Sequence, residues 1–301
     1  MKKNEFTFLK NLQGKILLGQ DLKNYTWLGV GGKAEIMFFP KDEKDLSLFF
    51  KNKPADLPYF ILGGGSNLLI RDGGIKGVVI KLNTPYFKQF NCKNDELTCF
   101  AGLPNANLKK ILPDYELGGL EFLASIPGTI GGLVKTNAGC FSKSLSDVLL
   151  KAYIMDSAGQ TKEITPDEFH FSYRSSTFDK DWIILALTLK GQKSTKEEII
   201  KTLDEQALYR KTHQVVGQKT AGSLFKNPQG HRAWELIKNA GCDTLTVGDA
   251  KLSEKHCNFM VNNGHAKAKD LETLGNQIVR RVKDKTGITL EWEVERVGLE
   301  K

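Results

Sequence analysis

The sequence predicts an α+β protein in which a strand-rich portion precedes a helix-rich portion. Short apolar runs separated by glycines extend to about residue 191, and helical periodicity follows it. Apolar and polar residues then alternate strictly over Ile288–Val294. We therefore expect a first domain over residues 1–191, with two subdomains divided near residue 83, and a second domain over residues 195–287. Residues 288–301 are expected to return to the first domain.

The first portion is predicted to contain short strands and one short helix. Trp182–Leu189 is apolar almost without interruption, as in a strand covered on both faces. Asp156–Gly159 has the composition of a turn between two extended segments. The predicted strands are Ile36–Phe39, Tyr59–Leu62, Val78–Leu82, Leu97–Ala101, Leu149–Asp156 and Trp182–Leu189, and the predicted helix is Asp42–Phe50.

Three amphipathic helices are predicted in the second portion. Ser194–His213 begins with a candidate cap, and His231–Ala240 ends before Gly241. Ala268–Lys285 is followed by Gly287, and glycine is the usual residue just after a helix. The apolar stripe of this last helix consists of Leu271, Leu274, Ile278 and Val282.

The composition is that of a globular protein. Hydrophobic residues make up 40% and charged residues 26% of the chain, and the net charge is 43 − 35 = +8. The lysines are scattered, which favours a solvated surface over nucleic-acid binding. The five cysteines form no C-x-x-C pair, so we expect neither a metal site nor a disulfide framework, but free thiols in a reducing cytosol.

No segment predicts export or membrane insertion. The first ten residues contain lysines but no apolar stretch of the kind found in signal peptides. The longest apolar run, Trp182–Leu187, is much shorter than the roughly 20 residues that cross a bilayer. We therefore expect a soluble, cytoplasmic protein.

Two glycine-rich regions are candidates for binding a dinucleotide. The turn Gly63–Asn67 follows a strand and precedes another short apolar run, so it is neither a Walker loop nor a glycine fingerprint that opens a helix. Pro127-Gly128 and Gly131-Gly132 mark two more turns, and Asn137–Gly139 repeats the pattern. Backbone amides in such turns can approach a diphosphate closely. Independent structural turns are the alternative interpretation.

Three further segments carry polar side chains suited to chemistry. Arg174 lies among small hydroxyl residues, and its planar fork of donors matches a carboxylate or phosphate, although a surface charge is the simpler interpretation. Ser223 follows Ala-Gly without a G-x-S-x-G elbow, so a hydrolase nucleophile is not predicted. Lys226 and Asn227 could hold a phosphate or a carbonyl, with a capped loop as the alternative. Spacing does not say which of three glutamates on one strand face enters a site: Glu291, Glu293 or Glu295.

Together, these segments and their order resemble the UDP-N-acetylenolpyruvoylglucosamine reductase family over nearly the whole chain. In that family the catalytic glutamate precedes a valine, with a glycine a few residues later, which matches Glu293, Val294 and Gly298. The short interval between Arg174 and the helix near Ser194 resembles the shorter of the family's two types. The matching segments are Asn24–Gly32, Gly63–Asn67, Ile126–Gly132, Asn137–Gly139, Tyr173–Ser176, Ala221–Pro228, Ser253–Phe259 and Leu290–Gly298.

The resemblance implies a two-subdomain FAD-binding domain of the PCMH/VAO type over residues 1–191 and a smaller α+β substrate-binding domain. It implies NADPH-driven reduction of UDP-N-acetylglucosamine enolpyruvate to UDP-N-acetylmuramate in peptidoglycan precursor synthesis. The implied catalytic residues are Arg174, Ser223 and Glu293, and the implied substrate contacts are Tyr173, Lys226 and Asn227. The implied FAD-binding residues are Gly63, Gly64, Gly65, Ser66, Asn67, Ser125, Ile126, Pro127, Gly128, Thr129, Gly131, Gly132, Asn137 and Gly139.

Two other functions stay open at this point. A sugar or lactone oxidase on the same FAD-binding fold often tethers its flavin through a histidine. None of the five histidines lies in the glycine-rich loops, which favours non-covalent FAD. The other alternative is a flavin-free nucleotide-binding module. We expect a monomer that binds a UDP-sugar nucleotide and NADPH, and neither nucleic acid nor a membrane.

Overall fold

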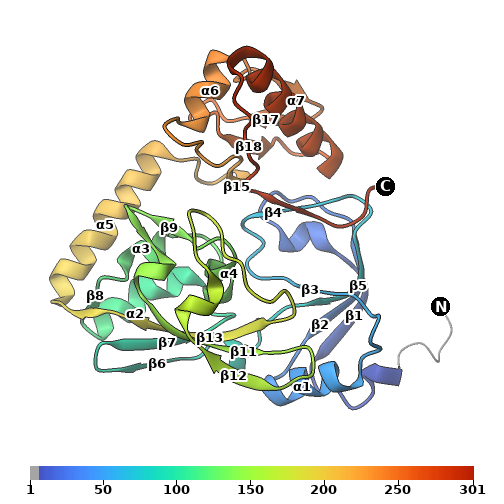
Figure 1. Cartoon of the computed structure of the whole chain (residues 1–301), viewed down its shortest axis with the longest axis vertical. Coiled ribbons are helices and arrows are strands. Elements are labelled where there is room, and N and C mark those ends of the chain that lie inside the picture. The colour runs from blue at the N-terminus through green and yellow to red at the C-terminus, as the bar shows by residue number, and fades with distance from the viewer. Residues whose placement is uncertain (1–6) are drawn as a thin grey trace. The chain divides into compact units, whose positions relative to one another are not determined.

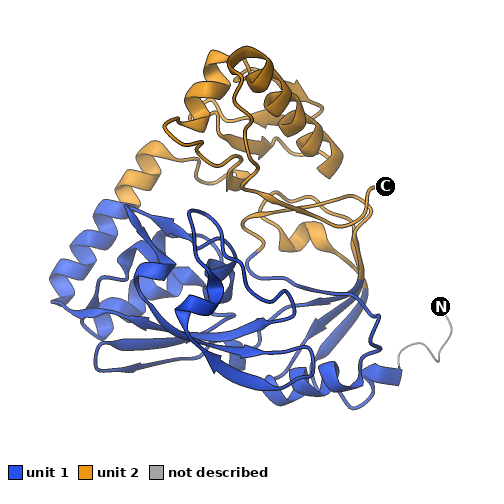
Figure 2. Ribbon diagram, viewed as in Figure 1, with its two compact units in different colours: residues 1–18, 36–64, 77–206 blue, residues 19–35, 65–76, 207–301 orange. Residues whose placement is uncertain are grey.

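In the computed structural model, which describes residues 7–301, the contacts within the chain divide it into two units (Figure 2). The expected domain limits stay a prediction. Residues 1–6, on which part of the expectation about a leader segment rests, lie outside the described residues. Within residues 7–301, no helix is both long and apolar enough to cross a membrane. Unit 1 comprises the residues up to Leu18, Ile36–Gly64 and Gly77–Gln206, and unit 2 comprises Gly19–Glu35, Gly65–Lys76 and Ala207–Lys301.

A four-stranded sheet, most of whose residues belong to unit 1, leads into the first glycine turn (Figure 1). Its strand order is β1-β2-β5-β3, and β3 pairs with β5 in parallel, with Tyr59 opposite Val78. Helix α1 (Glu43–Asn52) starts at Asp42, whose side chain accepts a hydrogen bond from the amide of Asp45. The strands are β1 (Lys15–Asp21), β2 (Lys33–Phe39), β3 (Tyr59–Ile61) and β5 (Ile75–Ile80).

The second sheet of unit 1 is antiparallel and has five strands in the order β12-β11-β13-β7-β6. Every residue of its central strand β13 is buried except Lys190, because the strand is covered on both faces. This arrangement agrees with the uninterrupted apolar run in the sequence. The strands are β6 (Phe90–Lys93), β7 (Glu96–Phe100), β11 (Leu149–Met155), β12 (Thr161–Ile164) and β13 (Ile183–Lys190).

Short helices and small hairpins support the loops of unit 1. Helix α4 packs against β13 and β7 through Ile130, Leu133 and Val134, which are buried. These side chains belong to one continuous apolar core that also contains residues of both sheets. The remaining elements of this unit are α2 (Leu108–Asp114), β8 (Leu117–Gly118), α3 (Glu121–Ser125), α4 (Ile130–Lys135), β9 (Gly139–Cys140), β10 (Lys143–Ser144) and β14 (Gln192–Lys193).

Unit 2 is built on an antiparallel sheet of order β15-β18-β17-β16 together with α6 and α7 (Figure 1). The predicted apolar stripe of α7 is fully buried, and this helix ends at Gly287, which is left-handed with φ 74°. Helix α5 (Lys196–His213) leads from unit 1 into unit 2. The elements are β15 (Lys219–Ser223), α6 (Ala233–Asn239), β16 (Thr246–Val247), β17 (Ala250–Leu252), β18 (Phe259–Asn262) and α7 (Ala268–Thr286).

The C-terminal segment of unit 2 differs from the prediction. The last strand, β19, is Glu295–Val297 rather than Ile288–Val294, and it pairs in parallel with β4 (Leu68–Ile70). Over the predicted range only Trp292 makes an isolated bridge, to Phe225. Alternating burial is nevertheless present over most of this range. The extended chain runs beside the irregular segment after β15, but it forms hydrogen bonds to that segment at only a few positions. The periodicity of the sequence therefore predicted correctly which side chains are buried, but it predicted wrongly that this segment pairs as a strand.

The other predicted helices and strands are all present, with ends that differ by at most three residues. The short apolar run after the glycine turn is β4, and the turn at Asp156–Gly159 is closed by a hydrogen bond from the Gly159 amide to the Asp156 carbonyl. The α+β fold class is thereby confirmed.

Candidate functional site

The first glycine turn and the loop at residues 126–129 lie against each other in unit 1. A Cβ added at Gly64 would lie 2.6 Å from the Cα of Gly128, and one at Gly63 would lie 3.2 Å from Oγ1 of Thr129. Gly128 has a φ of 118°, a conformation that side chains other than hydrogen rarely allow. The sequence thus folds two distant glycine-rich segments into close contact, in which the backbones of Gly64 and Gly128 meet.

Two side chains that the sequence analysis did not single out hold these loops. Asn105 is fully buried. Its backbone amide donates to the carbonyl of Gly128, and its side-chain amide donates to the carbonyl of Ile126, both at 3.1 Å. The Nζ of Lys81 donates to the carbonyl of Gly63 at 2.5 Å. Burial, and to a lesser extent the charge of Lys88, lower the pKa of Lys81 to about 8.

The rest of this predicted FAD-binding loop continues into α4. Gly131 sits close to Ala101, because a Cβ added to it would lie 2.8 Å from the Cβ of Ala101, whereas Gly132 has only Thr129 near it, at 3.8 Å. The hydroxyl of Ser125 donates to the carbonyl of Phe122 at 2.8 Å. Ile126 and Pro127 lie between these positions, in the segment that ends at Gly128.

Arg174 occupies a tight turn in unit 1 and is tied to the third glycine-rich segment. Its φ is 52°, in the left-handed region, and its Nη2 donates to the carbonyl of Gly139 at 2.6 Å. Asn137 is buried, and its side chain donates to the carbonyl of Ser172, next to this turn. Tyr173 is 60% exposed, and the Arg174 guanidinium lies 5.3 Å from its ring centre. Asn137, Gly139, Tyr173 and Arg174 are therefore brought together, and the Asn137 side chain is already used within the protein.

Ser223 lies in unit 2 at the end of β15, where the pairing with β18 is irregular. The register shifts between Thr220 and Ser223, and Gly222 in this bulge has a φ of 82° with nothing within 4 Å of an added Cβ. Bulges of this kind redirect a side chain and often lie beside active sites. Ser223 is therefore partly exposed next to open space, a position suited to contact with a bound molecule.

Buried Asn258 fixes the chain directly after Ser223. Its carbonyl accepts from the Leu224 amide at 2.7 Å, and its side-chain amide makes two hydrogen bonds with the backbone of Phe225, at 3.0 and 2.8 Å. Three hydrogen bonds from one buried residue leave this segment little freedom. The signal for Asn258 was its place in Ser253–Phe259, which the sequence analysis matched to the family without assigning a role.

Glu293 lies in the chain that runs beside this same segment. The amide of Glu293 donates to the carbonyl of Leu224 at 2.9 Å, so Ser223 and Glu293 are on paired stretches of backbone. Glu291, by contrast, forms an ion pair with Lys226 at 2.6 Å, and its side chain is 72% exposed. The structure therefore distinguishes Glu293 from Glu291, which the spacing of residues in the sequence could not do.

The second half of the first glycine turn also belongs to unit 2. A Cβ at Gly65, where φ is 65°, would strike the carbonyl oxygen of Tyr25 at 2.0 Å, so only glycine fits. Ser66 follows it, and the side-chain amide of Asn67 donates to the carbonyl of Glu293 at 3.0 Å. A predicted FAD-binding residue thus bonds directly to the backbone of a predicted catalytic one.

The predicted substrate contacts of unit 2 have partners within the protein. Lys226 pairs with Glu291, as described above, and Oδ1 of Asn227 accepts a hydrogen bond from the amide of Ala233, in the first turn of α6, at 2.9 Å. Arg174 belongs to unit 1, whereas Ser223 and Glu293 belong to unit 2. In residues 7–301 no three His, Cys, Asp or Glu side chains are grouped so as to hold a metal ion.

Comparison with known proteins identifies the family. The model of the FAD binding domain matches residues 34–165, and that of the C-terminal domain of UDP-N-acetylenolpyruvoylglucosamine reductase matches residues 214–297. A UDP-N-acetylenolpyruvoylglucosamine reductase of Bradyrhizobium sp. (strain ORS 278) is 41% identical to this chain, over 96% of this chain and 94% of its own length. The chain belongs to the UDP-N-acetylenolpyruvoylglucosamine reductase family.

Further members of the UDP-N-acetylenolpyruvoylglucosamine reductase family agree. The protein of that name from Paramagnetospirillum magneticum is 42% identical over 97% of this chain and 94% of its own length. The crystal structure of UDP-N-acetylenolpyruvylglucosamine reductase from Thermus caldophilus superposes with a TM-score of 0.81 at 35% identity, covering 95% of this chain and all of that one. The predicted fold, an FAD-binding domain followed by a smaller α+β domain, is thus confirmed.

The residues of unit 1 fit the dinucleotide that an FAD-binding domain holds. Where the turn at Gly63 and the loop at Gly128 meet, a Cβ at Gly64 would collide with the backbone of Gly128, and both loops are partly exposed. Peptide N–H groups presented in this way bind diphosphate oxygens. Lys81, beneath Gly63, adds positive charge to the same turn. In the sequence, Lys81 could have been noticed as a lysine that directly follows the apolar run of β5.

Proposed function

We propose that this chain is the FAD-dependent enzyme that reduces UDP-N-acetylglucosamine enolpyruvate to UDP-N-acetylmuramate, with NADPH as reductant, in peptidoglycan precursor synthesis. One observation carries the proposal beyond family membership. Ser223 and Glu293, 70 positions apart in the chain, lie on backbone segments joined by the hydrogen bond from the Glu293 amide to the Leu224 carbonyl. The proposed proton donor and the proposed carboxyl group thus lie on adjoining backbone segments.

The glycine-rich loops would hold FAD non-covalently. When bound, FAD takes hydride from NADPH and delivers hydride to the enolpyruvyl double bond. We assign FAD contacts to Gly63–Asn67 and to residues 125–132, with Asn105 and Lys81 keeping these loops in place. The amides of residues 126 and 130–132 already donate to backbone carbonyls, so we assign the diphosphate to the other amides of these loops. Asn137 and Gly139 connect the loops to Arg174 instead of presenting free side chains.

Ser223 would donate the proton that completes the reduction. Hydride addition to the alkene leaves a strongly basic carbon next to the substrate carboxylate, and a hydroxyl can protonate such a carbon although it is a weak acid in water. The Gly222 bulge, together with the bonds of Asn258 to the next two residues, orients the hydroxyl. Oγ of Ser223 is the atom from which the proton moves.

Arg174 and Glu293 would stabilise the negative charge that develops on the substrate carboxylate. A fixed guanidinium near that group lowers the barrier because its dipoles and charge are organised before reaction. A second carboxylate there would be repulsive, so Glu293 contributes either as the protonated acid or as the partner of a cation. The assignment of Arg174 rests on the family motif Tyr173–Ser176 and on its anchored loop.

Substrate and NADPH are both anionic nucleotides, and we assign Tyr173, Lys226 and Asn227 to the sugar nucleotide. The side chain of Lys226 is 20% exposed and its ammonium already pairs with one carboxylate, that of Glu291, so it is placed to bind a phosphate in exchange. We also propose that the enzyme is a monomer of the family's shorter type. A cytoplasmic location is supported by five free cysteines, which suit a reducing compartment.

An anaerobic half-reaction experiment tests the function. The purified protein should show a flavin spectrum, lose its visible absorbance on addition of NADPH, and regain it when UDP-N-acetylglucosamine enolpyruvate is added. A colourless protein that cannot take up FAD would point to the nucleotide-binding module instead. Reoxidation by sugars or lactones, but not by the enolpyruvyl nucleotide, would point to an oxidase.

A further inference from the structure

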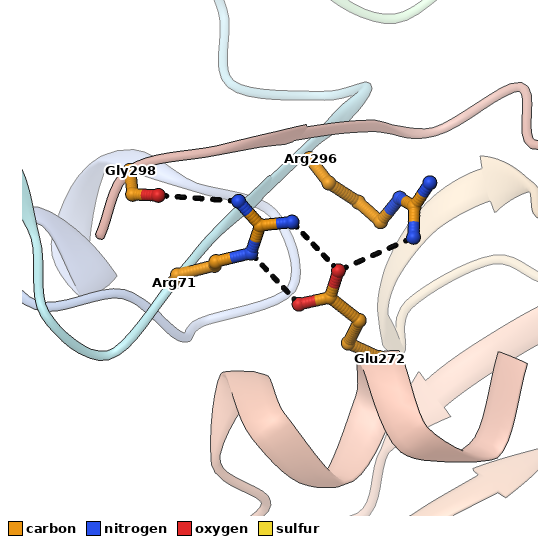
Figure 3. A network of polar contacts seen from close by, with 4 residues as sticks. All are labelled: Arg71, Glu272, Arg296 and Gly298. Carbon is orange, nitrogen blue, oxygen red and sulfur yellow. Dashed lines mark hydrogen bonds and ion pairs between the residues drawn. The ribbon is translucent and has the colours of Figure 1, made fainter. Parts of the chain in front are cut away.

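The carboxylate of Glu272, on helix α7, contacts two arginines, Arg71 and Arg296 (Figure 3). Glu272 accepts two hydrogen bonds from Arg71, at Nε and Nη2, both 2.9 Å, and one from Nη1 of Arg296 at 3.2 Å. Its side chain is only 15% exposed. A paired, bidentate contact of this kind is geometrically strict. The Arg71 guanidinium also donates to the carbonyl of Gly298, so it joins the helix to the last strand.

One turn further along α7, Trp292 packs where any residue other than Gly275 would place its side chain. Gly275 is buried, and a Cβ added to it would lie 2.2 Å from the Trp292 ring. Glu272 and Gly275 are three residues apart and therefore on one face of the helix. The indole also packs at 5.4 Å against Phe225, and the Arg296 guanidinium lies 4.4 Å from the indole ring centre.

Glu293 thus lies between two anchored residues, Trp292 and Arg296. The backbone around it is held as well, since its amide bonds to Leu224 and its carbonyl accepts from Asn67. Two residues later, the amide of Glu295 donates to the carbonyl of Asn67 at 3.1 Å. All of these contacts lie within unit 2.

We propose that Glu272 and Gly275 of α7, acting through Arg71, Trp292 and Arg296, form a positioning platform that sets Glu293 beside the Ser223 segment for the protonation step. The proposal rests on the proposed function for its kinetic consequence. None of the five residues needs to touch substrate or cofactor. Each acts through the chain segment that carries Glu293, and an error of about 1 Å in such a position can lower a rate on the order of 100-fold.

The test uses full-length, FAD-loaded enzyme with two variants and a matched control. Glu272→Gln removes the charge that the arginines share, and Gly275→Ala places a methyl group where Trp292 packs. Asp284→Asn is the control, an acid-to-amide change on the same helix in an ion pair with Arg280 whose two side chains are 70% and 85% exposed. Both flavin half-reactions are followed anaerobically by stopped flow, and amide hydrogen exchange of residues 291–297 is measured separately.

We expect both platform variants to be reduced by NADPH at the wild-type rate and to be reoxidised by the enolpyruvyl nucleotide roughly 10- to 100-fold more slowly. Exchange should accelerate at residues 293–297, and Asp284→Asn should match the wild type in every measurement. Reoxidation within twofold of wild type in both platform variants overturns the proposal, and so does an equal loss of both half-reactions with faster exchange throughout unit 2. If wild-type flavin is not reoxidised by the nucleotide, the proposed function fails. Hydrogen exchange then still decides whether the platform holds residues 293–297.

Discussion

Ser223 owes its position to its neighbours more than to its own contacts. Gly222 supplies a backbone conformation with φ 82°, and Asn258 fixes Leu224 and Phe225 through three hydrogen bonds. A hydroxyl held between a bulge and a fixed segment loses little orientational freedom when substrate binds. At the scale of single residues, the backbone around Ser223, the proposed proton donor, is therefore fixed before a ligand binds.

Removal of the Ser223 hydroxyl should separate the two half-reactions. In Ser223→Ala, NADPH should reduce the flavin as in the wild type, because that step needs no proton from this residue. Reoxidation by the enolpyruvyl nucleotide should slow on the order of 10²–10⁴-fold. Stopped-flow absorbance of the flavin measures both rates, with the exposed Ser157→Ala as control. Full turnover in Ser223→Ala would show that another group donates the proton.

Lys81 should make stability depend on pH. Its folded pKa of about 8 lies below the ordinary lysine value of 10.5, so between these values the unfolded chain binds more protons and stability rises with pH. Lys81→Met removes the cost of burying this charge. Its free energy of unfolding should therefore exceed that of the wild type most below pH 8, by up to about 3 kcal/mol. This advantage should fade towards pH 10.5.

Urea unfolding of the apoprotein at several pH values measures this difference, with Lys76→Met, an exposed position on β5, the strand directly before Lys81, as control. The hydrogen bond from Lys81 to Gly63 is lost at all pH values, so it shifts the whole curve and not its slope. An unchanged slope in Lys81→Met would mean that the ammonium is not the titrating group.

At the scale of elements, hydrophobic periodicity predicted the helices α1, α5, α6 and α7 and the strands β2, β3, β5, β7, β11 and β13, but it missed the short helices α2, α3 and α4 and the buried strand β18. The stripe of α7 and the apolar run of β13 are buried as expected, because burial on one face or on both is what these patterns encode. Ile288–Val294 was wrong as a strand, since alternation reports which side chains are buried but not which backbone groups pair. Hydrogen-bond partners depend on the neighbouring segment, here residues 224–226.

The two glycine-rich loops of unit 1 should prove to be one structural element. In Gly64→Ala the new methyl would lie 2.6 Å from backbone of Gly128, so the loops must move apart, and both apoprotein stability and FAD affinity should fall. In Gly132→Ala the nearest neighbour is 3.8 Å away, and alanine is the better helix former by up to about 1 kcal/mol. The apoprotein should therefore be unaffected or stabilised.

Thermal unfolding and FAD titration of both apoproteins measure these effects. A loss of FAD affinity in Gly132→Ala without a loss of stability would indicate direct contact with the cofactor. Equal stability of Gly64→Ala and wild type would contradict the close packing of the loops.

At the scale of the whole molecule, the charge of +8 suits an enzyme that binds two anionic nucleotides. Higher ionic strength should therefore raise KM for both NADPH and the sugar nucleotide and leave kcat nearly unchanged, because the Debye length falls from about 10 Å at 0.1 M salt to about 3 Å at 1 M. Steady-state kinetics over this range, with a neutral osmolyte as control, measure the effect. A salt-independent KM would confine recognition to buried contacts.

The sequence by itself determined the family and the class of cofactor, and it predicted part of the helices and strands and the segments proposed to carry chemistry. These inferences depend on local patterns: glycines that free the backbone, periodic apolar residues, and short motifs in a fixed order. A named relative that is 41% identical over 96% of the chain confirms the family.

Only the tertiary structure decided how Ser223, Glu293 and Asn67 come together in unit 2, and that Glu291 pairs with Lys226 instead. The supporting residues Asn105, Lys81, Asn258 and the α7 platform emerged only there. The physical reason is that each acts through hydrogen bonds or packing between segments 17 to more than 200 residues apart. Such contacts leave no period or spacing in the sequence, because the fold and not the chain brings the partners together.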